Sequence, residues 1–514
     1  MSKQEAALQI ISDERPLRRK LFTTGIIIGA ATGVVIAFFR GALELSEDLR
    51  PYLADFLNAH GAFGYAAWLF ALLTAAWILN SIVFYEPMST GSGIPQVKGI
   101  LLGEMRMRWL SVLLAKVFGG IIAIGAGMSL GREGPSVQIG ACVGQGISEL
   151  QGKPRTATRL YLTAGAGAGL AAAFNAPLAG VIFCLEELTK SFSPLVLMAT
   201  IAATVTATVV TQFVFGGGPV FHFPELLMMP LETIWLMVPL GVVIGFLGVG
   251  FNKGLFFILD AYDRLPKGIV RPLLPLLTGA GLFMVLPQVL GGGNRLVDSL
   301  VAHPEPLMML LILFVVKYMY TMLCFGSGVP GGIFLPMLVL GAVGGSLCAA
   351  AAEAFGVLPG SYAANFIVFG MAAYFAAVVK SPVTGSILVM EMTGSFEHLL
   401  ALILVSVSAY LTADAMHSRP VYDALLMRSL RKRRQEEKKS EKQRSIIEFS
   451  IAEASVMDGI YVKDFSWPED SLLVSIRRGE TEIIPHGTVK LQAGDLIYVL
   501  IEDREIDKIR KAVD

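Results

Sequence analysis

Hydrophobic residues dominate the chain from about position 21 to 425, whereas charged residues dominate about the last 90 positions. Four apolar stretches reach the length of about 20 residues that an α-helix needs to cross a bilayer, namely 23–43, 63–85, 232–251 and 307–325. The other apolar runs are short and interrupted by glycine and proline, which break the helical hydrogen-bond ladder. Non-helical backbone at membrane depth is tolerated only where it is buried in protein or lines a cavity. The pattern predicts a polytopic membrane protein with broken helices and a soluble tail.

Each interruption predicts the start of a helix, because proline is favoured in the first helical turn. The interruptions are Gly91–Pro95, Gly131–Pro135, Asn175–Pro177, Gly326–Pro336 and Ser381–Pro382. Helix N-termini present unpaired N–H groups and a partial positive charge, so they attract anions. Several helix starts directed at one point would bind a dehydrated anion without a fixed cation, which would hold a permeating ion too tightly.

The apolar region contains an internal duplication. Residues within segment 170–189 match residues within segment 374–393 at an offset of 205, and segment 131–141 aligns with 332–342 at an offset of 201. The matched residues are Pro177 with Pro382, Gly180 with Gly385, Glu186 with Glu391, Pro135 with Pro336, and Gly140 with Gly341. In contrast, Glu133 aligns with Phe334, and Glu187 aligns with Met392. Acidic residues present in one half only favour a specialised role over a scaffold role. Similarity alone leaves the relative orientation of the halves open.

Composition supports the membrane assignment. Of the 514 residues, 54% are hydrophobic and 16% are charged, and the mean hydropathy is +0.64; soluble domains carry roughly 25% charged residues. The cysteines Cys142, Cys184, Cys324 and Cys348 lie in apolar segments without CxxC or His-flanked spacing. We expect them to pack as small hydrophobic residues, with neither a disulfide framework nor a metal site.

Basic clusters predict the orientation in the membrane. Arg15, Arg18, Arg19 and Lys20 precede the first span, and the basic run 428–444 follows the last. The positive-inside rule therefore places both termini in the cytoplasm, together with the connection 151–159.

Six motifs occur in order along the apolar region: GSGIP (91–95), GREGP (131–135), AAFNAPLAG (172–180), LEE (185–187), GSGVPGGIFLPML (326–338) and RPVYDALL (419–426). Together they resemble the CLC family of chloride channels and chloride/proton exchangers over residues 20–428. The resemblance implies an all-α polytopic membrane fold of inverted repeats with tilted and broken helices. It also implies a homodimer with one anion pathway in each subunit.

The same resemblance implies site residues. Chloride would be bound by the Ser92 and Tyr422 hydroxyls and by the backbone N–H groups of Ile333 and Phe334. Glu133 matches the outer gating glutamate, and Glu187 matches the inner glutamate that passes protons to and from the cytoplasm in the exchangers.

These roles have a physical basis, since an ionised carboxylate at a helix N-terminus competes with chloride for the same place. Protonated Glu133 would swing away, admit chloride and carry a proton. The structural alternative for Glu133 is a carboxylate that balances the helix dipole or pairs with Arg132. The structural alternative for Glu187 is a carboxylate that pairs with Lys190. The neighbouring Glu186 makes the inner assignment depend on the alignment. A fluoride-exporting branch departs from the serine motif and the inner glutamate, so chloride is the preferred anion.

The tail predicts a small α+β domain. SLLVSIRR, TEIIP and DLIYVLI have strand character with turns between them, and DREIDKIRKAV reads as a short amphipathic helix. Residues 445–514 resemble the RCK-C (TrkA-C) regulatory domain, which suggests a prokaryotic source, because eukaryotic CLC proteins carry CBS domains instead. The resemblance suggests a small regulatory ligand such as cyclic di-AMP, with Arg477, Arg478 and His486 as candidate contacts; solvated surface charges are the alternative.

We therefore expect an N-terminal segment (1–20), a transmembrane domain (21–428) with halves at about 21–215 and 225–425, a charged linker (429–444) and the tail domain (445–514). The predicted function is secondary active chloride/proton antiport in the cell membrane, with no cofactor and no nucleic-acid partner. A passive chloride channel on the same scaffold is the main alternative. A potassium transporter is disfavoured, because the membrane region lacks a TVGYG-like filter. An intramembrane enzyme is disfavoured by the lack of an HExxH motif and of an intramembrane histidine partner.

Overall fold

The structure is a computed structural model that describes residues 3–221, 223, 226–303, 305–357, 360–440, 444–468, 471–502 and 505–514. It divides into two compact units, residues 1–426 and 427–514. Among the described residues of the first unit, seven helical stretches are long and apolar enough to cross a membrane.

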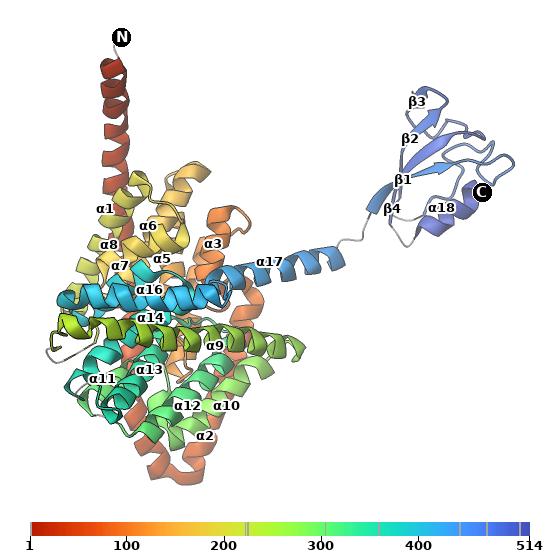
Figure 1. Ribbon diagram of the computed structural model, residues 1–514. Helices are drawn as coiled ribbons and strands as arrows, with labels where there is room; N and C mark the ends of the chain where they lie inside the picture. The colour runs from red at the N-terminus through yellow and green to blue at the C-terminus, as the bar shows by residue number, and fades with distance from the viewer. Residues whose placement is uncertain are drawn as a thin grey trace. The chain divides into compact units, whose positions relative to one another are not determined.

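The first half of the helical unit contains α1 to α8 (Figure 1). The elements are α1 (Lys3–Asp48), α2 (Arg50–Tyr85), η1 (Pro87–Ser89), α3 (Ile94–Leu102), α4 (Trp109–Gly125), α5 (Glu133–Leu150), α6 (Arg155–Phe174), α7 (Pro177–Phe183), η2 (Cys184–Leu188) and α8 (Pro194–Phe215). The predicted spans 23–43 and 63–85 fall within α1 and α2, and α2 bends at Gly61, where the backbone is not helical.

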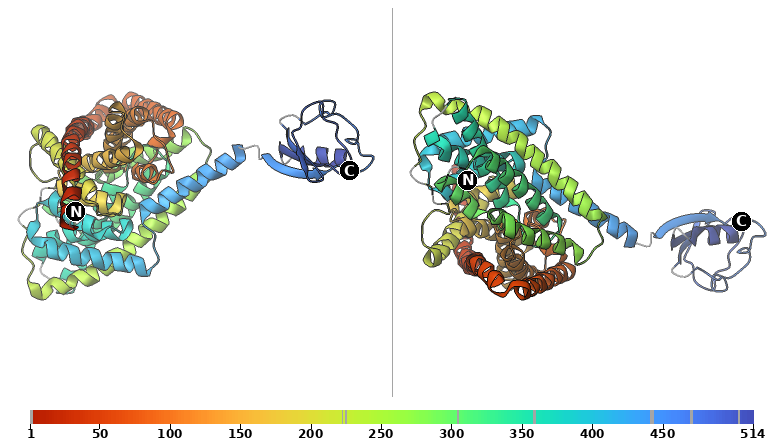
Figure 2. Two further views of the ribbon diagram at one scale, coloured as in Figure 1. Left: turned by 90° about the horizontal axis from the view of Figure 1, so that it is seen from above. Right: turned by 90° about the horizontal axis from the view of Figure 1, so that it is seen from below.

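The second half repeats this order from α9 onward. Its elements are η3 (Leu231–Leu236), α9 (Met237–Arg264), α10 (Val270–Val285), η4 (Pro287–Val289), α11 (Asn294–Ala302), α12 (Leu307–Gly326), α13 (Phe334–Ala354), η5 (Gly360–Tyr362), α14 (Ala363–Val379), α15 (Pro382–Thr393), η6 (Phe396–His398), α16 (Leu399–Ala415) and α17 (Val421–Ser440). Figure 1 shows α9, α14 and α16 side by side, and α9 runs along one edge of this unit in the view from below in Figure 2.

The predicted helix starts are confirmed. The five glycine- and proline-rich interruptions lead into α3, α5, α7, α13 and α15, which begin at Ile94, Glu133, Pro177, Phe334 and Pro382. The first of these helices follows Gly93, whose φ of 93° is a left-handed conformation that favours glycine. Each interruption therefore leads directly into a new helix.

Close helix packing depends on glycines that match between the halves. A Cβ atom built on Gly140 of α5 would lie 2.0 Å from the carbonyl oxygen of Gly165 in α6. One built on Gly341 of α13 would lie 2.5 Å from the carbonyl oxygen of Gly370 in α14. The absence of a side chain lets these backbones touch, as small residues do at helix interfaces in membranes.

The second unit contains the end of α17 and a four-stranded antiparallel sheet in the order β1-β4-β2-β3. The strands are β1 (Arg444–Ser450), β2 (Leu472–Arg478), β3 (Thr481–Ile483) and β4 (Leu496–Glu502), and α18 (Ile506–Val513) follows. The three predicted strands and the terminal helix are confirmed. The sequence analysis missed β1, and the charged stretch taken as a linker from residue 429 is helical as far as Ser440.

Candidate functional site

Three of the interruptions meet in the interior of the helical unit. Gly131 and Gly332 exchange two backbone hydrogen bonds, with N···O distances of 2.7 and 2.9 Å. Gly91 donates to the carbonyl oxygen of Val329 at 3.2 Å and accepts from the N–H of Gly331 at 3.0 Å. The loops before α3, α5 and α13 therefore form one small hydrogen-bonded cluster, and the first turns of these helices begin next to it.

Ser92, Glu133, Ile333, Phe334 and Tyr422 are all at least 98% buried. A Cβ atom built on Gly134 would lie 2.3 Å from the Ser92 hydroxyl oxygen, so this hydroxyl lies against the first turn of α5. The Tyr422 hydroxyl, from the first turn of α17, lies within electrostatic reach of Ser92 and Glu133. The fold therefore brings together residues that are up to 330 positions apart in the sequence.

The side-chain oxygens at this place have no protein partner within ordinary hydrogen-bond geometry among the described residues. Within the described residues, the Ser92 hydroxyl, the Tyr422 hydroxyl and both carboxylate oxygens of Glu133 make no hydrogen bond of ordinary geometry. A buried polar group without a partner costs about 1–3 kcal/mol. Hydroxyl donors and helix N-termini are groups that bind an anion, so this donor set fits a halide as substrate.

The Glu133 carboxylate lies beside the start of α13. A Cβ atom built on Gly131 would lie 2.3 Å from a carboxylate oxygen of Glu133 and 3.0 Å from the backbone nitrogen of Leu335. Arg132 Nε lies 4.0 Å from Glu133 Oε1, and Arg132 Nη1 also lies 3.5 Å from Glu44 Oε1. The carboxylate therefore faces backbone N–H groups of the neighbouring helix rather than a close ion-pair partner.

Ile333 and Phe334 carry the backbone positions predicted to bind the anion. Ile333 is the N-cap residue of α13, and Phe334 is its first residue. The Phe334 ring packs against Phe375 and Phe174, with ring centroids 4.7 and 5.4 Å apart. These aromatic contacts fix the first turn of α13 and exclude water from its side.

Glu187 lies in a different environment. Its carboxylate accepts hydrogen bonds from Lys98 Nζ at 2.8 Å and from the Ser381 hydroxyl at 2.9 Å. Lys98 also donates to Asp423, and Asp423 pairs with Lys190. The pairing of the inner glutamate with Lys190 that the sequence suggested is therefore indirect, through Lys98 and Asp423.

Glu186 has a separate structural role. Its carboxylate accepts from the backbone N–H groups of Val383 and Thr384 at 3.2 and 2.7 Å, at the start of α15. In return, Glu391 of α15 accepts from the N–H groups of Leu178 and Ala179 at 3.1 and 2.8 Å, at the start of α7. Each half thus caps a helix of the other half, which explains why this glutamate is duplicated while Glu187 is not.

Sequence analysis missed Lys98 and Asp423, which contact Glu187 directly or through one hydrogen bond. Asp423 lies within the RPVYDALL motif, directly after Tyr422, and Lys98 lies three residues beyond the GSGIP motif. Their spacing of 325 residues gave no signal that they touch.

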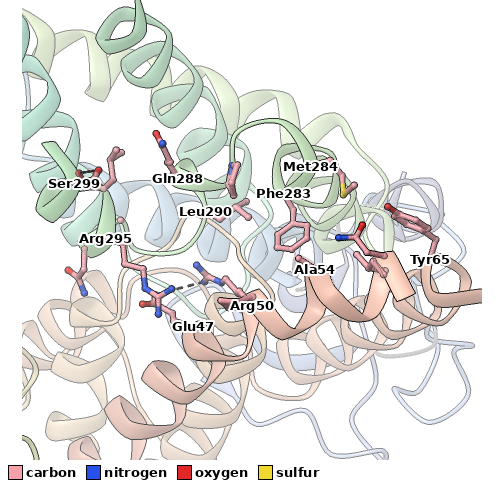
Figure 3. A pocket seen from close by; sticks show the side chains of 17 residues that line it. Glu47, Arg50, Ala54, Tyr65, Phe283, Met284, Gln288, Leu290, Arg295 and Ser299 are labelled. Carbon is pink, nitrogen blue, oxygen red and sulfur yellow. Dashed lines mark hydrogen bonds and ion pairs between the residues drawn. The ribbon is translucent and has the colours of Figure 1, made fainter. Parts of the chain in front are cut away.

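A pocket of about 460 Å³ lies elsewhere, between α1, α2, α10 and α11 (Figure 3). Arg50 and Arg295 project into it beside apolar side chains such as Phe283 and Leu290, and Arg50 lies 3.9 Å from Glu47. None of the predicted site residues lines this pocket.

The candidate contacts in the tail have different surroundings, although Arg477 and Arg478 are neighbours in β2. Arg478 makes a two-point ion pair with Asp495 at 2.8 Å and also donates to the carbonyl oxygen of Lys490. Arg477 lines a hollow of about 420 Å³ on one sheet face, together with Glu480, Glu482 and Tyr498. His486 lies in the turn after β3 and does not line that hollow. The hydrogen bonds of the Arg478 side chain are thus made within the domain.

Comparison with known proteins identifies a family for each of the two units. A profile of the voltage-gated chloride channel family matches residues 71–414, and a TrkA-C domain profile matches residues 446–514. The chain is 36% identical over 423 residues to a protein of Vibrio parahaemolyticus named H(+)/Cl(-) exchange transporter ClcA, covering 79% of this chain and 89% of that relative. A Yersinia pseudotuberculosis relative of the same name is 36% identical over 418 residues, covering 80% of this chain and 87% of the relative.

Solved structures agree with this family. A slow cyanobacterial Cl-/H+ antiporter superposes with a TM-score of 0.75 at 31% identity, covering 80% of this chain and 98% of that one. A CLC-type fluoride/proton antiporter superposes with a TM-score of 0.64 at 22% identity, covering 79% and 97%, and this likeness shows the fold alone. The family profile spans two thirds of this sequence, and the chain covers 89% of the Vibrio parahaemolyticus relative. The chain therefore belongs to the voltage-gated chloride channel (CLC) family.

Proposed function

We propose that this protein is a secondary active chloride/proton antiporter of the membrane. One observation carries the proposal: the buried Glu133 carboxylate lies without a hydrogen-bond partner at the meeting point of three helix starts, near the equally unpartnered hydroxyls of Ser92 and Tyr422. The relatives named as H(+)/Cl(-) exchange transporters support exchange over passive conduction.

The proposed chloride site consists of the Ser92 and Tyr422 hydroxyls and the backbone N–H groups of Ile333 and Phe334. These neutral donors stabilise a dehydrated halide and still release it, because no lysine or arginine binds the ion directly. In the ionised form, the Glu133 carboxylate occupies the helix N-termini that would otherwise attract chloride. Protonation removes that charge, so chloride takes the place while the glutamate carries a proton.

Glu187 is the proposed inner proton acceptor. It is 2% exposed and lies within electrostatic reach of the same Tyr422 hydroxyl that approaches Glu133. Protons would pass between Glu187 and Glu133, while chloride passes the Ser92 and Tyr422 hydroxyls. Alternation between the two forms of Glu133 couples the fluxes.

Flux measurements on protein purified into liposomes test this function. An imposed chloride gradient should drive protons against their own gradient. Proton movement, recorded with a pH-sensitive fluorophore or electrode, should stop when chloride is removed. Chloride flux without any uphill proton movement would instead identify the passive channel. Glu187→Gln should remove uphill proton movement, and retained coupling would move the inner role to another residue.

We further propose the finer assignments that the sequence suggested: a homodimer, with both termini in the cytoplasm of a bacterial cell. The membership of the CLC family supports the homodimer. The mass of the protein in detergent tests the dimer. Reaction of a Ser2→Cys variant, whose four native cysteines are replaced by serine, with membrane-impermeant reagents tests the orientation of the N-terminus.

We also propose regulation through the tail by a small anion such as cyclic di-AMP. Arg477 supports it, because it lines a hollow, but Glu480 and Glu482 line the same hollow and would repel an anion. Deletion of residues 445–514 should abolish any effect of the nucleotide on chloride flux. No response of the full-length protein to the nucleotide would contradict the proposal.

A further inference from the structure

A buried chain of charged side chains connects Glu187 to the surface of the helical unit. Lys98 donates to Glu187 Oε1 at 2.8 Å and to Asp423 Oδ1, and Lys190 donates to Asp423 Oδ2 at 2.5 Å. Exposure of the side chains rises along this chain, from 2% for Glu187 and 5% for Lys98 to 31% for Asp423 and 54% for Lys190. The chain therefore leads from the buried acid to solvent without a break.

We propose that Lys98 and Asp423 form the proton-transfer route between Glu187 and the aqueous phase, with Lys190 holding Asp423 in place. This inference rests on the proposed antiport function, because it assigns how the inner glutamate exchanges its proton. Glu187 itself is nearly inaccessible to water. Another group must therefore exchange protons with solvent and pass them to Glu187, and Asp423 is the first partly exposed acid along the chain.

The transfer is balanced in protons. The Lys98 ammonium donates one proton to the Glu187 carboxylate, which leaves a neutral amine and a carboxylic acid. Asp423, protonated by solvent, then donates to that amine and becomes a carboxylate again. One proton has moved from water to Glu187, Lys98 has its original charge, and the reverse sequence releases the proton.

Burial lowers the free-energy cost of the intermediate, in which Lys98 is a neutral amine and Glu187 is a carboxylic acid. A buried ion pair has lost the solvation of both charges, so the neutral lysine and carboxylic acid lie closer in free energy to the charged pair than they would in water. Lysine suits this role because its ammonium loses a proton readily when buried, whereas the arginine guanidinium stays charged. A proton-transfer route therefore requires a side chain at position 98 that can lose its proton, whereas a simple salt bridge requires only a positive charge.

The test uses that difference between lysine and arginine. Proton and chloride fluxes are measured together in liposomes for the wild type, Lys98→Arg, Lys98→Met, Asp423→Asn and Asp423→Glu. We expect Lys98→Arg, Lys98→Met and Asp423→Asn to lower the number of protons moved per chloride at least fivefold, and Asp423→Glu to restore most of the ratio. A structural salt bridge predicts a near-normal ratio for Lys98→Arg, since the positive charge is kept.

Asp414→Asn is the matched control, because Asp414 pairs with Lys380 at 2.8 Å in the same half of the protein and lies outside this chain. It should leave the flux ratio unchanged. If the wild type couples the two ions and Glu187→Gln uncouples them, but Lys98→Arg and Asp423→Asn couple normally, the proton route is wrong while the antiport function stands. If the wild type shows no coupling, the proposed function itself fails.

Discussion

The two halves of the helical unit share their scaffold and differ in their acidic residues. Lys116 of α4 donates to the carbonyl oxygens of Ser89 and Gly91, and Lys317 of α12 donates to those of Val289 and Gly291. The elements η1 and α3 recur at an offset of 200 residues as η4 and α11. Duplicated side chains thus hold loops and helix starts in place, which both halves need.

The differences lie where the proposed chemistry is. Ser92 of the first half corresponds to Gly292, and Glu133 corresponds to Phe334. The turn with Glu187, η2, is a π-helix, whereas the corresponding end of α15 stays α-helical through Thr393. A π-helical turn is uncommon and occurs often at functional sites. Both copies thus keep the structural groups, whereas the two acidic residues proposed to carry protons, Glu133 and Glu187, occur only in the first copy.

The largest effect should follow from removal of the acid that has no counterpart. Glu133→Ala should abolish proton movement and leave a chloride pathway open, because the competing carboxylate is gone. Paired chloride and proton flux measurements check this. Chloride-coupled proton transport that persists in this variant would contradict the role of Glu133.

The matched glycines should give the next largest effect, on stability. A methyl group on Gly140 or Gly341 pushes α5 from α6 or α13 from α14, and overpacking of this kind costs about 1–3 kcal/mol. Gly140→Ala should be the worse of the two, because its added Cβ would lie 2.0 Å from a backbone oxygen rather than 2.5 Å. Thermal unfolding in detergent, monitored by size-exclusion chromatography, compares the stability of the two variants. An equal loss of thermal stability would show that the two halves pack alike.

The matched lysines should also act on stability alone. Lys116→Met and Lys317→Met each remove two hydrogen bonds to loop carbonyls, and a hydrogen bond contributes about 0.5–1.5 kcal/mol. The midpoint of thermal unfolding should fall in both variants. A loss confined to one of them would mean that the duplicated lysines no longer have the same role.

The smallest effect should come from the reciprocal helix caps. Glu186→Gln and Glu391→Gln each keep one of the two acceptor oxygens at the helix N-terminus and remove the negative charge, whose interaction with a helix start is typically about 0.3–1 kcal/mol. Both variants should retain coupled transport with slightly reduced thermal stability. Loss of coupling in Glu186→Gln alone would assign the inner proton role to Glu186.

Much of this organisation is written locally in the sequence. The apolar lengths, the glycine and proline interruptions and the repeated prolines predicted the membrane spans, the helix starts and the duplication, because each depends on residues close together in the chain. The alternation in the tail predicted β2 and β4 for the same reason. Strand β1 was missed because it follows a run of charged residues that masks its short alternating pattern.

Tertiary structure decided which of these residues meet. No local pattern pairs Lys98 with Asp423, or places the Ser92 hydroxyl against Gly134, since these contacts join separate helices. It also decided that Arg478 pairs with Asp495, although its sequence context made it a candidate ligand contact. The sequence by itself determined where helices begin and which residues lack a counterpart in the other half. Only the fold could set the partners of each charge, because burial and pairing depend on neighbours that the chain brings together from hundreds of residues away.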